Sequence, residues 1–295
     1  MKQQFQHFNF RDKTLQIIDQ ANEIISEYTA AGYSLTLRQL YYQFVARGLC
    51  PNSQREYNKL GKTISNGRLA GLIDWSAIED RTRNLKRKNH WTSPQEILQG
   101  CADQFTYDLW KTQETRVEVW IEKEALSGVI QPICDRLDIP YFSCRGYVSQ
   151  SEAWKAGQRV ASRAQDGQET IILHLGDHDP SGMDMTRDNA DRVALFSEIS
   201  EFITVERIAL NMDQIEQFNP PPNPSKETDS RNDEYVKKYG NQSWELDALE
   251  PAVIEGLIAT HVEDYVDHFQ MDEMKTKQRH ARQQLQEIAD SWSEK

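Results

Sequence analysis

Apolar residues recur at helical spacing in the early part of the chain. In 12–31 they fall at about every third or fourth position, and in 37–47 they fall at i, i+3, i+4, i+7 and i+8. Gly48 ends the second of these segments, and Ser34 or Thr36 can cap its start. The pattern therefore predicts two amphipathic helices close to the N-terminus.

A third helix and a less regular segment are expected next. The apolar positions of 53–71 predict a helix with a basic outer face, and 72–91 favours a short strand or wing with a basic tail. Three short helices and a wing are typical of a winged helix-turn-helix, whose third helix enters the major groove. The side chains that would contact DNA are Arg55, Lys59, Lys62 and Arg68. A generic helical bundle with a solvated basic face is the alternative.

The remainder of the chain alternates apolar runs with amphipathic segments. The runs that predict strands are 116–121, 140–144, 171–175 and 204–210. The segments that predict helices between them are 125–137, 151–165 and about 185–194. Such alternation is typical of right-handed βαβ units that form one parallel sheet. A Pro-rich loop is expected over 218–231, followed by a helical region from Trp244 onward.

The net charge of −12 is unevenly distributed. Residues 1–91 hold 14 Lys and Arg against 8 Asp and Glu, a balance of +6, whereas the remainder holds 20 against 38, a balance of −18. The basic front is suited to a polyanion, and the acidic back requires cations. A protein that is acidic overall can bind DNA when its charge is segregated in this way.

Composition indicates a soluble globular protein without a membrane segment. Apolar residues make up 38% and charged residues 27% of the chain, and no window approaches ~18 uninterrupted apolar residues. The N-terminus lacks the apolar core of a signal peptide, so a cytoplasmic location is expected. The four cysteines are scattered without a Cys-x-x-Cys pair, which favours free thiols over a zinc site.

The sharpest candidate site follows the apolar run 171–175. Gly176 comes directly after this run, and Asp177 and Asp179 follow with one residue between them. Glu122 ends an earlier predicted strand, so the three carboxylates are expected at the carboxyl edge of one parallel sheet. Carboxylates that converge there need a divalent cation, and Mg²⁺ is the natural one. A lone Asp-x-Asp pair is commonly a surface turn, and the upstream glutamate weakens that alternative.

Neighbouring polar residues form a second tier of candidates. His178 stands between the two aspartates and is expected to be a neutral neighbour rather than a metal ligand. The second-tier candidates are Glu124, Arg145, Asp184 and Asp247.

Two tyrosines stand side by side in the second predicted helix. Tyr41 lies on its apolar stripe, whereas Tyr42 lies one residue off the stripe, on the same face as Arg38 at i−4. A hydroxyl beside a guanidinium can attack a phosphate, because the cation stabilises the phenolate and holds the phosphoryl oxygens. Periodicity alone leaves open, and even favours, the alternative that Tyr42 is an ordinary half-exposed aromatic residue.

The strand-end glutamate and the later Gly-Asp-x-Asp resemble the Toprim domain, a metal-binding fold shared by topoisomerases, bacterial primases and some nucleases. Three stretches are similar to the A subunit of topoisomerase VI and its meiotic double-strand-break relatives: Trp120-Ile-Glu-Lys-Glu-Ala-Leu126, Arg145-Gly-Tyr147 and Gly176-Asp-His-Asp-Pro-Ser-Gly-Met-Asp-Met185. Trp244-Glu-Leu-Asp-Ala-Leu249 looks like a later acidic stretch of that family, and Arg38-Gln-Leu-Tyr-Tyr42 resembles its winged-helix motif Arg-x-x-Tyr/Phe-Tyr. The short chain most resembles reduced, A-subunit-like proteins of phages and mobile elements.

The resemblance implies an α/β protein with an N-terminal winged-helix domain, a Toprim domain and a C-terminal helical region. The expected boundaries are 1–95 for the winged helix, 96–115 for a connector, 116–250 for the Toprim domain and 251–295 for a helical extension. It also implies that Tyr42 becomes covalently joined to DNA and that Mg²⁺ is bound by Glu122, Asp177 and Asp179. In this family the tyrosine of one subunit works with the metal of the other, which implies a homodimer on double-stranded DNA. An ATPase subunit of the B type, acting in trans, is a further implied partner.

Three functions follow as hypotheses. The first is a Mg²⁺-dependent DNA-cleaving transesterase of the type IIB topoisomerase kind, with Tyr42 as nucleophile and Arg38 beside the phosphate. The second is a hydrolytic Toprim nuclease, in which metal-activated water attacks and Tyr42 is structural. The third is a non-catalytic DNA-binding factor that keeps the fold. The expected location is the cytoplasm, near the nucleoid, or the host cytoplasm for a phage protein.

Overall fold

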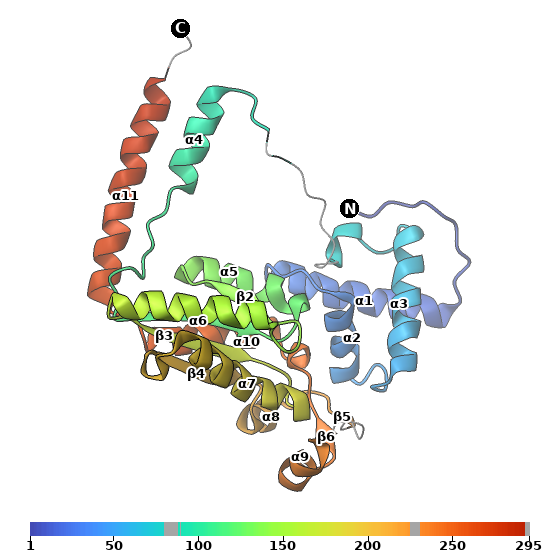
Figure 1. The fold of residues 1–295 in the computed structure, drawn as a ribbon. Coiled ribbons are helices and arrows are strands. Elements are labelled where there is room, and N and C mark those ends of the chain that lie inside the picture. Colours follow the sequence, from blue (N-terminus) through green and yellow to red (C-terminus); the bar gives the residue numbers. More distant parts are fainter. Residues whose placement is uncertain (80–87, 89, 225–230, 293–295) are drawn as a thin grey trace.

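The computed structural model describes residues 1–79, 88, 90–224 and 231–292 (Figure 1). Its α-helices are α1 (Asp12–Ala30), α2 (Leu37–Ala46), α3 (Gln54–Leu69), α4 (Pro94–Gln104), α5 (Ser127–Leu137), α6 (Gln150–Gln165), α7 (Pro180–Ser197), α8 (Met212–Phe218), α9 (Asn232–Tyr239), α10 (Pro251–Glu263) and α11 (His268–Ser291). Its strands are β1 (Thr115–Ile121), β2 (Tyr141–Ser143), β3 (Glu169–Leu175), β4 (Ile203–Ala209), β5 (Asn223–Pro224) and β6 (Gln242–Ser243).

The three predicted N-terminal helices are present as α1, α2 and α3. Thr36 caps α2: its side chain accepts a hydrogen bond from the backbone N–H of Gln39 at 3.2 Å, and the Gln39 side chain accepts one from the Thr36 N–H at 2.9 Å. This reciprocal pairing satisfies two N–H groups that the first turn leaves open. The helices enclose their own apolar core, which includes Ile18, Leu40 and Ile64.

The segment expected to form a wing lies partly outside the described residues. Of 72–91, the structure describes 72–79, 88, 90 and 91, with a short 3-10 turn at Trp75–Ala77. Ile78 forms an isolated parallel bridge with Leu35, which ties this segment to the start of α2. The basic tail at 80–87 and 89 lies outside the described residues, so the wing itself stays a prediction.

The four predicted strands form one parallel sheet in the order β2-β1-β3-β4. The chain moves from β1 outward to β2 and then returns past β1 to β3. The strand order therefore reverses between β1 and β3, and open α/β sheets bind ligands beyond the carboxyl ends of the strands at such a switch point. Glu122 directly follows β1 and Gly176-Asp177 directly follow β3, so both acids stand at this switch point.

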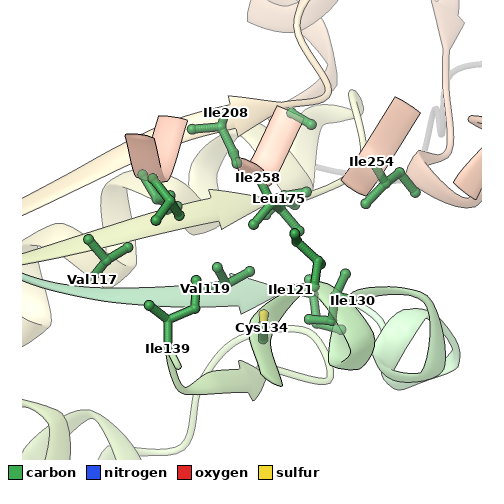
Figure 2. Packing of buried hydrophobic residues seen from close by; sticks show 14 of the residues in the cluster. Val117, Val119, Ile121, Ile130, Cys134, Ile139, Leu175, Ile208, Ile254 and Ile258 are labelled. Carbon is green, nitrogen blue, oxygen red and sulfur yellow. The ribbon is translucent and has the colours of Figure 1, made fainter. Parts of the chain in front are cut away.

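Helices cover both faces of the sheet (Figure 1). Figure 2 shows one face, where Val119 and Ile121 of β1 and Leu175 of β3 pack with α5 and α10. The opposite face of β1 and β3 packs against α6 and α7 in a separate cluster that includes Trp120 and Ile172. Successive residues of a strand point to opposite faces of the sheet, so they pack alternately into one core and the other.

The C-terminal stretch contributes to the same fold in two ways. Helix α10, at the start of the expected extension 251–295, inserts Ile254 and Ile258 into the core that β1, β3 and α5 share (Figure 2). Helix α11 continues beyond the body and lies beside α4 (Figure 1). Gln99 and Gln286 exchange side-chain hydrogen bonds of 2.6 and 2.7 Å between these two helices. Among the described residues, no helix is long and apolar enough to cross a lipid bilayer.

Several elements were not predicted. Helices α8 and α9 and the short β5–β6 ribbon surround the Pro-rich loop, whose residues 225–230 lie outside the description. The stretch Trp244–Leu249 contains only a 3-10 turn at Leu246–Ala248 and is not the start of a helix. A backbone bridge joins Trp244 to His178, and this bridge holds the start of the stretch beside the Asp-x-Asp loop.

Candidate functional site

The two strand-end acids that the sequence singled out are in contact. The backbone N–H of Asp177 donates a hydrogen bond of 2.9 Å to Oε2 of Glu122. Glycines make this approach possible: a Cβ on Gly176 or on Gly182 would stand 3.1 Å from the same Glu122 oxygen. At Gly182 it would also stand 2.2 Å from the carbonyl oxygen of Asp177, so no side chain fits there. The glycines on either side of the aspartates thus let backbone close around the Glu122 carboxylate.

Asp179 has a structural task as well as its place in the motif. Its Oδ1 accepts hydrogen bonds from the Gly182 N–H at 2.7 Å and from the Ser181 hydroxyl at 2.8 Å, which makes it the N-cap of α7. The helix therefore begins at Pro180. The sequence predicts a start near Met185, and that prediction is wrong. The reason is local, because an aspartate cap followed by proline at the first helical position is a strong start signal.

Burial dominates the electrostatics of these acids. It raises the pKa of Glu122, and it raises the pKa of Asp177 to about 7, against the opposing charge of Lys123. Arg207 of β4 lies beneath the loop and donates hydrogen bonds of 2.9 and 2.6 Å to the carbonyl oxygens of Gly176 and Asp177. Carboxylates with raised pKa values at a buried sheet edge gain stability from a bound cation.

Lys123 and Glu245 belong to the site, and sequence reasoning missed both. The Lys123 ammonium lies 2.9 Å from Oδ2 of Asp177, 2.7 Å from Oε2 of Glu245 and 3.1 Å from Oδ1 of Asp247. Asp247, a second-tier candidate, is thereby brought to the centre of the site. The only sequence signal for these two residues is their position next to candidate acids: Lys123 follows Glu122, and Glu245 stands two residues before Asp247. Lys123 and its three acids are called the lysine cluster below.

Tyr42 and Arg38 project from α2 onto the lysine cluster. Arg38 contacts Oε1 of Glu245 at 3.3 Å and Oδ2 of Asp247 at 3.7 Å. The Tyr42 hydroxyl lies near Glu245 and Asn223, and the side chain is only 2% exposed. Periodicity favoured a half-exposed Tyr42, but the side chain is buried. The α/β part of the chain covers the side of α2 that lies off the apolar stripe.

Further polar contacts join the two parts of the chain around Tyr42. Asn52, between α2 and α3, donates a hydrogen bond of 2.7 Å to Oδ1 of Asn223. Gln43 donates one of 2.8 Å to Glu250, which also accepts a hydrogen bond from the Tyr28 hydroxyl. The candidate nucleophile and the acidic sheet edge of one chain are thus held against each other by side chains from both parts.

His178 contacts aromatic side chains and holds the loop that carries the acids. Its Nδ1 lies 2.7 Å from the hydroxyl of Tyr235, and that hydroxyl donates to the His178 carbonyl oxygen at 2.8 Å. The rings of Tyr235, Tyr239 and Trp244 surround its imidazole. Burial lowers the pKa of His178 to about 4, so the ring is neutral at physiological pH.

The other second-tier candidates lie at the rim. Arg145 pairs with Glu124 at 3.2 Å, and both stand beside the carboxyl end of β2. Asp184 accepts a hydrogen bond of 2.6 Å from the Tyr147 hydroxyl and pairs with Arg231 at 2.8 Å. Among the described residues, the side chains of Glu124, Arg145 and Asp184 make no hydrogen bond or ion pair with the side chain of Glu122 or Asp177.

The predicted DNA-contacting residues of α3 divide into two groups. Arg55, Lys59 and Lys62 are exposed, whereas Arg68 is half-buried. The Arg68 guanidinium donates hydrogen bonds to the carbonyl oxygens of Trp75 and Ile78 and lies over the Trp75 ring. Arg68 therefore does not share the exposed face and instead ties α3 to the segment that follows it.

The side chains present suit a hard divalent cation better than a soft one. Glu122, Asp177 and Asp179 supply only oxygen donors, which Mg²⁺ prefers. The carboxylate of Glu122 lies in a cradle that a Cβ on either flanking glycine would fill. As the side chains stand, no three His, Cys, Asp or Glu groups in the described part of the chain are arranged to hold a metal ion.

A scan against protein-family models, a search of curated proteins and a search of solved structures each found no match to this chain.

Proposed function

We propose that the protein is a Mg²⁺-dependent DNA-cleaving transesterase, with Tyr42 as its nucleophile and Glu122, Asp177 and Asp179 as its metal ligands. The N-terminal helices would act as a winged helix and the sheet as a Toprim domain. The observation that supports this best is that Arg38, four residues before Tyr42 on α2, pairs with Glu245 and Asp247, and that the Lys123 ammonium joins these two acids to Asp177.

The reaction is an exchange of phosphate esters. The Tyr42 oxygen forms a bond to phosphorus while one bridging bond from phosphorus to deoxyribose oxygen breaks. The phenolic proton passes to Glu245, whose carboxylate lies beside the hydroxyl, and the leaving oxygen takes up a proton. Arg38 stands where it can hold a phosphoryl oxygen. A bound Mg²⁺ would supply positive charge to the phosphate and to the leaving oxygen.

The partners follow from the same proposal. The exposed basic face of α3, with Arg55, Lys59 and Lys62, would hold double-stranded DNA through its phosphates. Two copies would be needed to cut both strands, and a homodimer is therefore proposed. An ATPase subunit in trans would be required for strand passage but not for cleavage. The proposed location is the cytoplasm, where the DNA substrate lies.

The decisive experiment traps the protein on DNA. Purified protein is incubated with supercoiled plasmid and Mg²⁺, stopped with a strong denaturant, and the DNA is assayed for covalently attached protein. Wild type is expected to give adducts, and Tyr42→Phe is expected to give none. Tyr41→Phe is the matched control, because Tyr41 is the adjacent tyrosine and its hydroxyl hydrogen-bonds to the carbonyl oxygen of Ser53. Adducts at wild-type level in Tyr42→Phe would overturn the proposal.

One observation favours a second function, hydrolysis by a metal-activated water. Tyr42 is 2% exposed, and burial followed by the charges of Asp247 and Glu245 raises its pKa, both of which suit a structural tyrosine. Under this alternative, Tyr42→Phe still cleaves plasmid and leaves no protein on the DNA in either form. Asp177→Asn abolishes cleavage under both functions, so the tyrosine variant is the one that separates them.

A further inference from the structure

The lysine cluster has the form of a cation site. An ammonium group carries three N–H donors. In Lys123 it lies within 3.1 Å of one carboxylate oxygen from each of Asp177, Glu245 and Asp247. The three acids come from two separate segments of the chain, the loop after β3 and the stretch after β6. Their convergence on one point is therefore a product of the fold and not of local sequence.

The lysine cluster contains a carboxylate oxygen that Lys123 does not bind. Oδ2 of Asp247 is buried and has no hydrogen-bond partner, and the side chain of Asp247 is 1% exposed. Nε of Arg38 lies 3.7 Å from this oxygen, which is too long for a hydrogen bond. A buried carboxylate oxygen without a partner is costly, and its presence here indicates a position where a stronger cation could bind.

The charges around the site limit how many divalent ions it needs. The acids are Glu122, Asp177, Asp179, Glu245 and Asp247, and the cations that face them are Arg38, Lys123 and Arg207. With ordinary charges, five negative groups against three positive ones leave a formal charge of −2. One divalent ion neutralises that charge, and a second would leave an equal positive excess in a buried place.

We propose that the ammonium of Lys123 is a built-in cation that occupies a second cation site formed by Asp177, Glu245 and Asp247. The divalent ion then binds only on the other side of Asp177, with Glu122 and Asp179. Lys123 thereby places a permanent positive charge between the metal ligands and Tyr42, within reach of a phosphate held there. The inference rests on the proposed function for its metal site, but its test does not depend on cleavage.

The test counts bound ions after the ammonium is removed. Mn²⁺ serves as the probe, and bound ions are counted by calorimetric titration and by electron paramagnetic resonance of the free ion. Lys123→Met keeps the length of the side chain and removes its charge. It is expected to bind one more Mn²⁺ per chain than wild type. Lys155→Gln is the matched control, because it removes an exposed lysine that pairs with Glu152, and it should bind as many ions as wild type.

A double variant guards against misfolding. Three carboxylates without a cation could prevent Lys123→Met from folding when metal is absent, so each variant is first checked by thermal unfolding. Lys123→Met combined with Asp247→Asn removes one of these charges and is expected to return the count to that of wild type. The inference is overturned if folded Lys123→Met binds no additional ion, or if the double variant keeps it. If wild type binds no Mn²⁺ at all, the proposed function fails instead.

Discussion

Tyr42 on α2 lies beside Glu245, which follows β6, across the boundary between the helical N-terminal part and the α/β part. Burial, together with the charges of Asp247 and Glu245, raises the pKa of Tyr42. The chain thus holds its candidate nucleophile protonated and covered, at 2% exposure. A DNA phosphate can reach the hydroxyl only if the two parts of the chain move apart, either to admit the DNA or to exchange partners with a second copy.

This requirement can be tested by holding the two parts together. Asn52 and Asn223 are hydrogen-bonded at 2.7 Å, one from each part. In a background with Cys50 and Cys101 replaced by serine, Asn52→Cys and Asn223→Cys are joined with a short bis-maleimide. We expect the cross-linked protein to lose covalent trapping on plasmid, while the same variant without cross-linker keeps it. Full adduct formation by the cross-linked protein would show that Tyr42 reacts without separation of the parts.

The backbone around Glu122 should tolerate no side chain. Gly182→Ala would bring a Cβ to 2.2 Å from the carbonyl oxygen of Asp177, and the loop must shift to accept it. We expect a loss of about 1–3 kcal/mol in the free energy of unfolding, typical of overpacking, and at least tenfold weaker Mn²⁺ binding. Denaturant titration and calorimetry measure the two effects.

Gly256→Ala is the control for that substitution. Gly256 lies in the exposed face of α10, and a Cβ there meets nothing within 4 Å. Alanine is a better helix former than glycine, so we expect a gain of up to about 1 kcal/mol and unchanged Mn²⁺ binding. Equal effects of the two substitutions would contradict the close packing described at Gly182.

A buried ion pair between β1 and α6 should make stability depend on pH. Burial alone would raise the pKa of Glu118, but the hydrogen bond from Arg159 and the charge of Arg163 hold it at about 2. Because this pKa lies below that of an unfolded glutamate, near 4.5, the pair stabilises the fold fully above about pH 4.5. The contribution, roughly 3 kcal/mol, is lost as the pH falls toward 2.

The Glu118→Gln variant checks this pH dependence. It should be several kcal/mol less stable than wild type at neutral pH, since it leaves Arg163 without its charge partner. The difference between the two proteins should shrink as the pH falls from 4.5 to 2, as followed by urea unfolding. A difference that stays constant over this range would mean that the carboxylate does not titrate with the expected pKa.

The basic face of α3 should govern DNA affinity through salt-sensitive contacts. Replacing Arg55, Lys59 and Lys62 together by alanine is expected to weaken DNA binding and to reduce the slope of log affinity against log salt by about 2–3, near 0.9 per phosphate contact. Fluorescence anisotropy over a range of salt concentrations measures this slope. Arg68→Ala is expected to lower thermal stability while leaving the slope unchanged, because its guanidinium is bonded to backbone carbonyls. An equal loss of slope in both variants would place Arg68 on the DNA.

The sequence by itself determined the regular elements and the acids at the strand ends. Helical spacing located α1, α2 and α3, and the apolar runs located β1 to β4 within two residues of their observed ends. Strand-end position also brought Glu122 and Asp177 together, because parallel strands end at one edge of a sheet. These predictions succeeded because each depends on a local period or on the order of elements.

Only the tertiary structure decided what surrounds Tyr42 and Asp177. Periodicity placed Tyr42 off the apolar stripe of α2, and it could not show that Glu245 and Asn223 cover that side. Lys123 follows Glu122 in a charged run, where a lysine is normally solvated. Its ammonium instead joins acids from two distant segments of the chain. Contacts of this kind arise from the packing of the helical part against the sheet edge, which no periodic pattern along the chain records.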